Sequence, residues 1–354
     1  MARKTVAGHA QDKNQKQAST IDLTQSATAG KTYFVSQSKV QSWRTCRQQY
    51  HYAYNENLVP KKPQRPFMFG TIVHDMLKAD AMGQDAWAVY DQATAINERV
   101  FKEEEEMYGR IADDIAYIME EYFNFTSPLH HIPVNGKYAE QEFEVPLVSD
   151  EIRLKGRIDG AVSDKRLKWL LEHKTHKTFP APENRWRNMQ SVIYINVAKV
   201  HWNLKLDGTC WDYIRSKPPT RPQITKKGIL RERAIDTLPN VIEEVIRHNK
   251  LMTTGATLIA QAKQNRTNYF QRYYTPISPE ITGHVMDDFK NTAVEMSVIG
   301  AKHKQRNMGR HCDWCKYNKL CAAELQGMDV DFVKEREYQV DEATAQAPVR
   351  EIED

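Results

Sequence analysis

Four of the five cysteines are spaced so that they strongly constrain the fold. Cys312, Cys315 and Cys321 form a C-x₂-C-x₅-C run near the end of the chain, whereas Cys46 lies close to its beginning. An odd cysteine count without an export signal argues against disulfides and favours metal ligation. One shared metal centre would force the two ends of the fold to meet. Four thiolates can hold zinc or a 4Fe–4S cluster, and spacing alone does not choose between them.

Composition and charge indicate an ordinary globular protein with a basic body. Hydrophobic residues make up 40% of the 354 residues and charged residues 27%. No segment approaches the roughly 20 apolar residues of a membrane span, so we expect a cytoplasmic protein without a membrane partner. Residues 335–354 hold seven acids and two arginines, although the whole chain is net +4. A basic body suits a polyanionic partner, or it is simply a solvated surface.

The patterning predicts one α/β domain between two polar ends. Residues 1–32 lack periodicity and are expected to be a disordered leader, and residues 327–354 an acidic, flexible tail. Within the domain, 33–326, we expect a helical part (33–135), a core (136–215), and a second helical part with the cysteine cluster (216–326). Alternating apolar residues predict strands at 140–147, 152–162, 168–174 and 209–215. Helices are expected around 36–50, from 69, and at 186–204, 235–264 and 278–300.

The predicted hairpin brings two carboxylates and a lysine together. Alternation places Glu172 and Lys174 on one face of their strand, and pairing through the turn at Asp164 would bring Asp159 close to Glu172. Paired carboxylates suit Mg²⁺ or Mn²⁺, and a lysine beside them can stabilise a phosphate under attack. Phosphodiester hydrolysis therefore fits, but an exposed, salt-bridged hairpin is the more common explanation of these three residues alone.

Further motifs give these residues a family context. Asp159…Glu172-His173-Lys174 resembles the motif of the PD-(D/E)XK nucleases, and Gln190 and Tyr194 resemble the Q-x-x-x-Y of their RecB-like branch. The resemblance implies a restriction-endonuclease-like core, a central mixed sheet flanked by helices. It also implies a catalytic role for Asp159, Glu172, Lys174, Gln190 and Tyr194. The implied metal ligands are His74, from a G-x-x-x-H motif, Asp159, Glu172 and the His173 carbonyl. Glu142 matches a further acid that supports the ligands or binds a second metal.

The cysteine arrangement resembles a second feature of this branch. One cysteine at the start and three at the end are similar to the iron–sulfur staple of the CRISPR-associated adaptation nucleases and the AddB-type nuclease subunits. The resemblance implies a 4Fe–4S cluster on Cys46, Cys312, Cys315 and Cys321 that joins the helical N- and C-terminal parts. Cys210, in an apolar context, is expected to be buried.

Several basic and aromatic segments are candidates for DNA contact. They include the surroundings of Cys46, the loop 214–221 and the aromatic run 269–274. Aromatic rings beside cations suit single strands or frayed ends. The basic residues selected from these segments are Arg44, Arg47, Lys217, Arg221 and Arg272.

Together these features predict a Mg²⁺- or Mn²⁺-dependent deoxyribonuclease. We expect an exonuclease acting on single-stranded or duplex ends of linear DNA in recombination, repair or replication. We expect it to be of a small phage type, with a helicase or recombination factor as a possible partner. The alternatives are a non-catalytic iron–sulfur or zinc DNA-binding adaptor that retains the fold, and a zinc-binding transcription or packaging factor.

Overall fold

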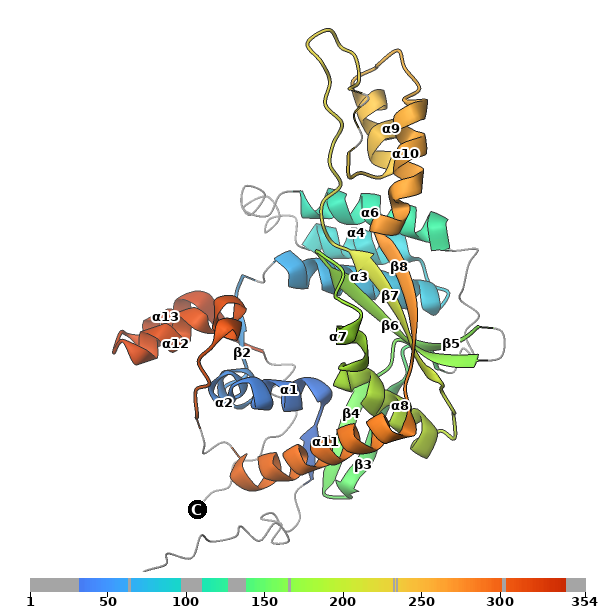
Figure 1. Ribbon diagram of the computed structural model, residues 1–354. Coiled ribbons are helices and arrows are strands. Elements are labelled where there is room, and N and C mark those ends of the chain that lie inside the picture. Colours follow the sequence, from blue (N-terminus) through green and yellow to red (C-terminus); the bar gives the residue numbers. More distant parts are fainter. Residues whose placement is uncertain are drawn as a thin grey trace, which may run out of the picture.

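A four-stranded mixed sheet organises the molecule (Figure 1). The computed structural model describes residues 32–62, 65–96, 110–126, 138–164, 167–231, 233, 235–300 and 304–341. The strand order is β5-β6-β7-β8, with β5 and β6 antiparallel, β6 and β7 parallel, and β7 and β8 antiparallel. The strands are β5 Gly160–Asp164, β6 Leu167–His176, β7 Gly208–Arg215 and β8 Phe270–Pro276. The predicted α/β class is confirmed.

Helices cover both faces of this sheet, which explains its long buried strands. Between the parallel strands β6 and β7 the chain forms α7, Glu183–Trp186, and α8, Met189–His201. Helix α8 packs on one face of β6, while α3, Arg65–Ala81, packs on the other. Apolar residues of α4, Ala86–Ile96, and α6, Ile111–Thr126, extend the core on the α3 side.

A second sheet holds the first half of the predicted meander. Its order is β1-β4-β3, from β1 Tyr33–Val35, β3 Glu142–Ser149 and β4 Ile152–Arg157. The single strand expected at 152–162 is wrong: β4 ends at Arg157 and β5 begins at Gly160. The two residues between them carry the chain from one sheet to the other, and the second of these is Asp159.

Residues 216–264 form an arm between β7 and β8. It ends in two helices, α9 Pro239–His248 and α10 Ala256–Gln264, with a small core of their own (Figure 1). The chain then returns along the sheet as β8, a strand that the sequence analysis did not predict. The long helix α11, Pro279–Ile299, follows and packs on α8 and on α1, Gln37–Thr45.

The last described residues are ordered, contrary to the tail expected from residue 327. After α12, Asn318–Leu325, the chain forms α13, Val330–Glu337, and β9, Tyr338–Val340. Strand β9 pairs antiparallel with β2, Leu58–Pro60. Tyr338 packs with Tyr52 and Tyr317 in a small core, called the Tyr317 core below. Residues 1–31 of the expected leader and the tail beyond 341 lie outside the described residues.

The two ends of the domain meet through protein contacts. Besides the β2–β9 pair, the Tyr317 hydroxyl donates to the Leu58 backbone carbonyl at 2.6 Å. The backbone N–H of Gln48 donates to the backbone carbonyl of Gln305 at 3.1 Å. The short helix α2, Arg47–Tyr50, continues into a π-helical turn, His51–Asn55, whose Tyr52 packs in the core with Tyr317. No helix in the described ranges is long and apolar enough to span a membrane.

Candidate active site

The β5–β6 pairing brings Asp159 to Glu172 and His173, as the sequence predicts. Gly160 pairs with Leu171, so the residue before Gly160 reaches the middle of β6. The Asp159 carboxylate accepts a hydrogen bond from the His173 amide, with 2.8 Å between Oδ2 and N. Asp159 is thereby fixed against the backbone of the E-x-K segment.

Glu172 and Lys174 share one face of β6 and form an ion pair. The Lys174 Nζ lies 2.8 Å from Glu172 Oε2. Glu172 is buried, and its other oxygen, Oε1, has no hydrogen-bond partner among the described residues. Burial, together with repulsion from Asp159, raises the pKa of Glu172 to about 7, although Lys174 opposes the rise. A second cation beside Oε1 would relieve this cost, since an unpaired buried carboxylate is unfavourable.

Helix α8 adds the predicted glutamine and tyrosine to this face. Asn188 caps the helix by accepting a hydrogen bond from the Ser191 amide. Gln190 and Tyr194 are four residues apart and therefore share a helix face. Lys174 Nζ donates to Gln190 Oε1 at 3.2 Å. Burial and the negative charge of Glu172 raise the pKa of Tyr194 to about 12, so its hydroxyl remains protonated.

His74 approaches the same point from the opposite face of the sheet. It lies on α3, with its ring centroid 6.3 Å from that of His173. Burial lowers the pKa of His74 to about 4, despite the favourable charge of Asp159. A neutral imidazole is the form that binds a metal. The structure therefore brings His74, Asp159, Glu172, Lys174, Gln190 and Tyr194 into one region.

A buried polar network behind the E-x-K segment was not predicted. Its centre is Asp212 of β7, which lies 2.8 Å from the His173 ring and accepts from Arg272 Nε at 2.7 Å. The Tyr122 hydroxyl also donates to Asp212. Burial alone would raise the pKa of Asp212, but the bonds from His173 and Arg272 lower it, so it stays ionised. An acid in the middle of the apolar strand 209–215 was the available signal for this network.

The described residues do not assemble a complete metal site by side chains alone. No group of three or more His, Cys, Asp or Glu side chains in the described ranges is positioned to hold a metal ion. Around Glu172 the donors nevertheless fit a hard divalent cation: two carboxylates, one with an unpartnered oxygen, and a neutral imidazole. Carbonyl and water oxygens commonly complete such sites.

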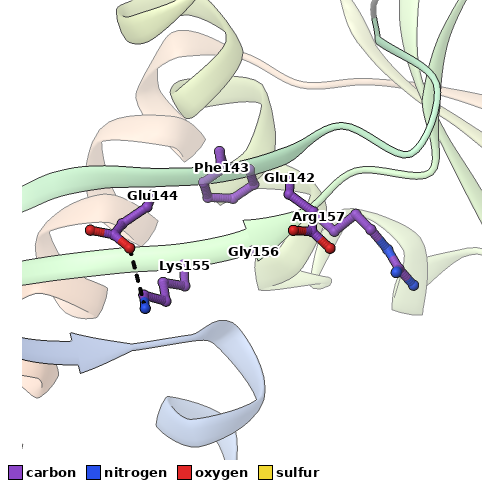
Figure 2. Close-up of a pocket in the computed structure, with 6 residues that line it drawn as sticks. All are labelled: Glu142, Phe143, Glu144, Lys155, Gly156 and Arg157. Atoms are coloured by element: carbon purple, nitrogen blue, oxygen red, sulfur yellow. Dashed lines mark ion pairs between the residues drawn. The ribbon is translucent and has the colours of Figure 1, made fainter. Parts of the chain in front are cut away.

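A shallow hollow of about 510 Å³ opens beside this group, on the hairpin of β3 and β4 (Figure 2). Glu144 and Lys155 form an ion pair of 3.2 Å across it. Gly156, in its lining, lies so close to Tyr194 that a Cβ there would be 3.0 Å from the hydroxyl. The exposed Glu142 also lines the hollow and pairs in register with Arg157, outside the Glu172–Lys174 contact. The hollow is therefore a neighbour of the candidate site.

No three of the cysteines among the described residues are positioned to hold a metal ion. Burial raises the pKa of Cys315, and Cys46, Cys312 and Cys321 each add to the rise through their charge. The Cys46 thiol lies 4.0 Å from the Gln305 carbonyl and the Cys315 thiol 3.9 Å from Gln49 Oε1. Cys210 is buried beside Trp169 and Leu171, as expected.

The five cations proposed to contact DNA all have partners inside the protein. Arg47 pairs with Glu295, Lys217 with Asp236 and Arg221 with Glu244. Arg44 donates to the Asp288 carbonyl and to the Thr292 hydroxyl. Arg272 is part of the buried Asp212 network, and its neighbours Tyr269 and Phe270 are buried as well. DNA contact by these five residues stays a prediction, and Arg272, which is 13% exposed beside the buried Asp212, is the least accessible of them.

Comparison with known protein families gives the chain a family. The sequence profile of the PD-(D/E)XK nuclease superfamily matches residues 35–322. No curated protein matches the chain. A solved structure described as "Crystal structure of SSO0001" aligns over 84% of this chain and 89% of its own, with 9% identity and a TM-score of 0.30, a likeness too weak to carry weight. On the strength of the profile match, which spans most of its length, the chain belongs to the PD-(D/E)XK nuclease superfamily.

Proposed function

We propose that this protein is a Mg²⁺- or Mn²⁺-dependent deoxyribonuclease that acts on the ends of linear DNA. One observation carries the proposal. Glu172 is buried beside Asp159, with one oxygen paired to Lys174 and the other without a partner in the part of the chain that the structure describes. Such a carboxylate suits a divalent cation, and a bound cation of this kind activates water and neutralises charge on a phosphodiester.

The protein groups divide the remaining work. Asp159, Glu172 and His74, with the His173 carbonyl, would hold the cation. Lys174, whose pKa is raised by Glu172 and Asp159 against the effect of burial, stays protonated and can stabilise the phosphate. Gln190 orients Lys174 through its hydrogen bond. The protonated Tyr194 hydroxyl is available as a donor towards the substrate.

Cleavage of defined DNA forms tests this proposal. End-labelled single strands, blunt duplexes and covalently closed circles are incubated with Mg²⁺ or Mn²⁺, using wild type and Lys174→Ala. We expect release of label from linear DNA by the wild type, intact circles, and a loss of at least about 100-fold in Lys174→Ala. Absence of cleavage, or equal cleavage by the variant, would contradict the nuclease assignment. Cutting of closed circles would contradict only the preference for ends.

We also propose that Cys46, Cys312, Cys315 and Cys321 hold a 4Fe–4S cluster with a structural role. The proposal is supported by the set of four thiolate donors and by the charges of Cys46, Cys312 and Cys321, each of which raises the pKa of Cys315. Since β2–β9 pairing and the Tyr317 core already join the chain ends, the cluster would reinforce an existing contact.

Metal analysis of anaerobically purified protein separates iron from zinc. We expect about four iron atoms and four acid-labile sulfides per chain, lost in Cys46→Ser and kept in the matched control Cys210→Ser. One zinc per chain without iron would instead indicate a zinc centre. A zinc-binding or non-catalytic adaptor role would require, in addition, that wild type fails to cleave.

The proposed context, a phage-type enzyme of DNA recombination or repair with a helicase or recombination partner, depends on the cleavage result.

A further inference from the structure

Aromatic rings continue the Glu172–Lys174 face of the sheet onto β7 and β8. In the strand register, Glu172 lies beside Trp211 and Lys174 beside Tyr213, and Trp211 lies beside Tyr273. These side chains therefore project from the same face. Tyr213 is buried, with its ring parallel to that of Trp211, whereas Tyr273 is partly exposed. The proposed cleavage site thus borders an aromatic layer that reaches the surface at Tyr273.

Arg185 of α7 covers this surface. Its guanidinium carbon lies 3.5 Å from the ring centroid of Tyr273 and 5.8 Å from that of Tyr213. Its Nε is buried without a hydrogen-bond partner, and no carboxylate among the described residues forms an ion pair with Arg185. Rings rather than an acid stabilise this cation, so its charge remains available to an anion.

A second cation–aromatic pair follows directly in the sequence. The Arg187 guanidinium lies 5.0 Å from the ring centroid of Trp186, and Trp186 is 47% exposed. Arg187 is exposed as well, and the one acid on α7 is Glu183. This arrangement differs from that of Arg215, Arg221 and Arg272, each of which is paired with a carboxylate.

We infer that four of these residues, the α7 surface (Arg185, Trp186, Arg187 and Tyr273), bind a nucleic acid strand with unpaired bases. The inference rests on the proposed function, because the strand bound here would be the same strand whose phosphate is cleaved beside Glu172. Every base has a π face that can stack on an aromatic ring or a guanidinium plane, and arginines bind phosphates. A duplex keeps its bases stacked inside and cannot use Trp186 in this way.

Binding measured without cleavage tests the α7 surface. Fluorescence anisotropy is recorded for a labelled oligodeoxythymidine and for a blunt duplex of equal length, in EDTA and with Lys174→Ala as the parent protein. Adding Trp186→Ala or Arg185→Ala should weaken single-strand binding by about tenfold or more and change duplex binding by less than about twofold. Trp186→Phe, which keeps a ring, should restore most of the affinity.

Two controls make the result specific. Arg247→Ala removes an exposed arginine from the distant helix α9 and should leave single-strand binding unchanged. Trp186 is largely exposed, so Trp186→Ala should unfold at the same urea concentration as its parent. An unchanged affinity for the single strand, or equal loss for strand and duplex, would overturn the inference.

The two proposals can fail separately. If wild type cleaves no DNA but Trp186→Ala selectively loses the single strand, the nuclease proposal falls and the α7 surface stands. If wild type cleaves but Trp186→Ala binds like its parent, the α7 surface falls and the nuclease proposal stands.

Discussion

Glu172 carries most of the chemistry that can be inferred at the scale of single residues. Its pKa of about 7 results from burial and from repulsion by Asp159, so the folded protein binds a proton there more readily than an unfolded chain does. A divalent cation must displace this proton, and metal affinity is therefore coupled to pH. His74, whose pKa is lowered to about 4, stays neutral above pH 6 and adds nothing to this dependence.

This coupling predicts the direction of a pH effect. Mn²⁺ binding to the metal-free protein should be about tenfold weaker at pH 6 than at pH 8, because Glu172 is mostly protonated at the lower pH. Electron paramagnetic resonance of free Mn²⁺ measures both affinities. Glu172→Gln should bind Mn²⁺ weakly at both values. Equal wild-type affinity at pH 6 and pH 8 would contradict the role of Glu172.

Asp212 is the residue on which we expect stability to depend most. Asp212→Asn leaves the buried Arg272 without its ion pair, at a cost of about 3–5 kcal/mol in the free energy of unfolding. Asp236→Asn is a matched control, since Asp236 is partly exposed and pairs with Arg215 and Lys217; we expect at most about 1 kcal/mol there. Urea unfolding of the two variants measures both values, and equal losses would contradict the structural role of Asp212.

Elements were predicted well where their partners are close in sequence. The β5–β6 hairpin follows from alternation and one turn, and it was enough to bring Asp159 to Glu172. Strands β8 and β9 were missed because their partners, β7 and β2, lie far away in the sequence. Similarly, the sequence of a basic segment does not reveal which acid faces it in the fold. The arginines selected as DNA contacts therefore have partners in the protein, while Arg185 was not selected.

The C-terminal elements yield a prediction of their own. Truncation after Met328 removes α13 and β9 and exposes the Tyr317 core. We expect a loss of at least about 2 kcal/mol in the free energy of unfolding, the cost of exposing one large apolar side chain. The full-length protein is the reference for this loss. Urea unfolding of both proteins checks this, and similar stabilities would show that β9 contributes little.

At the scale of the whole molecule, the candidate site residues gather around β6, an inner strand of the central sheet. The second sheet supplies Asp159 through the chain crossing at Arg157–Gly160, α3 supplies His74, and α8 supplies Gln190 and Tyr194. The α7 surface continues this face across β7 and β8, whereas β2, which pairs with β9, lies apart from this sheet (Figure 1). The superfamily assignment covers these elements, since the matched range 35–322 includes all of them.

Metal titration of cleavage tests the central claim most directly. Protein freed of metal with EDTA is titrated with Mn²⁺ while metal binding and the single-turnover cleavage rate are followed together, for wild type and Glu172→Gln. We predict that wild-type cleavage is absent without metal and rises in parallel with Mn²⁺ occupancy, while Glu172→Gln stays inactive although its circular dichroism matches the wild type. Cleavage by the metal-free protein, or undiminished cleavage by Glu172→Gln, would contradict the account.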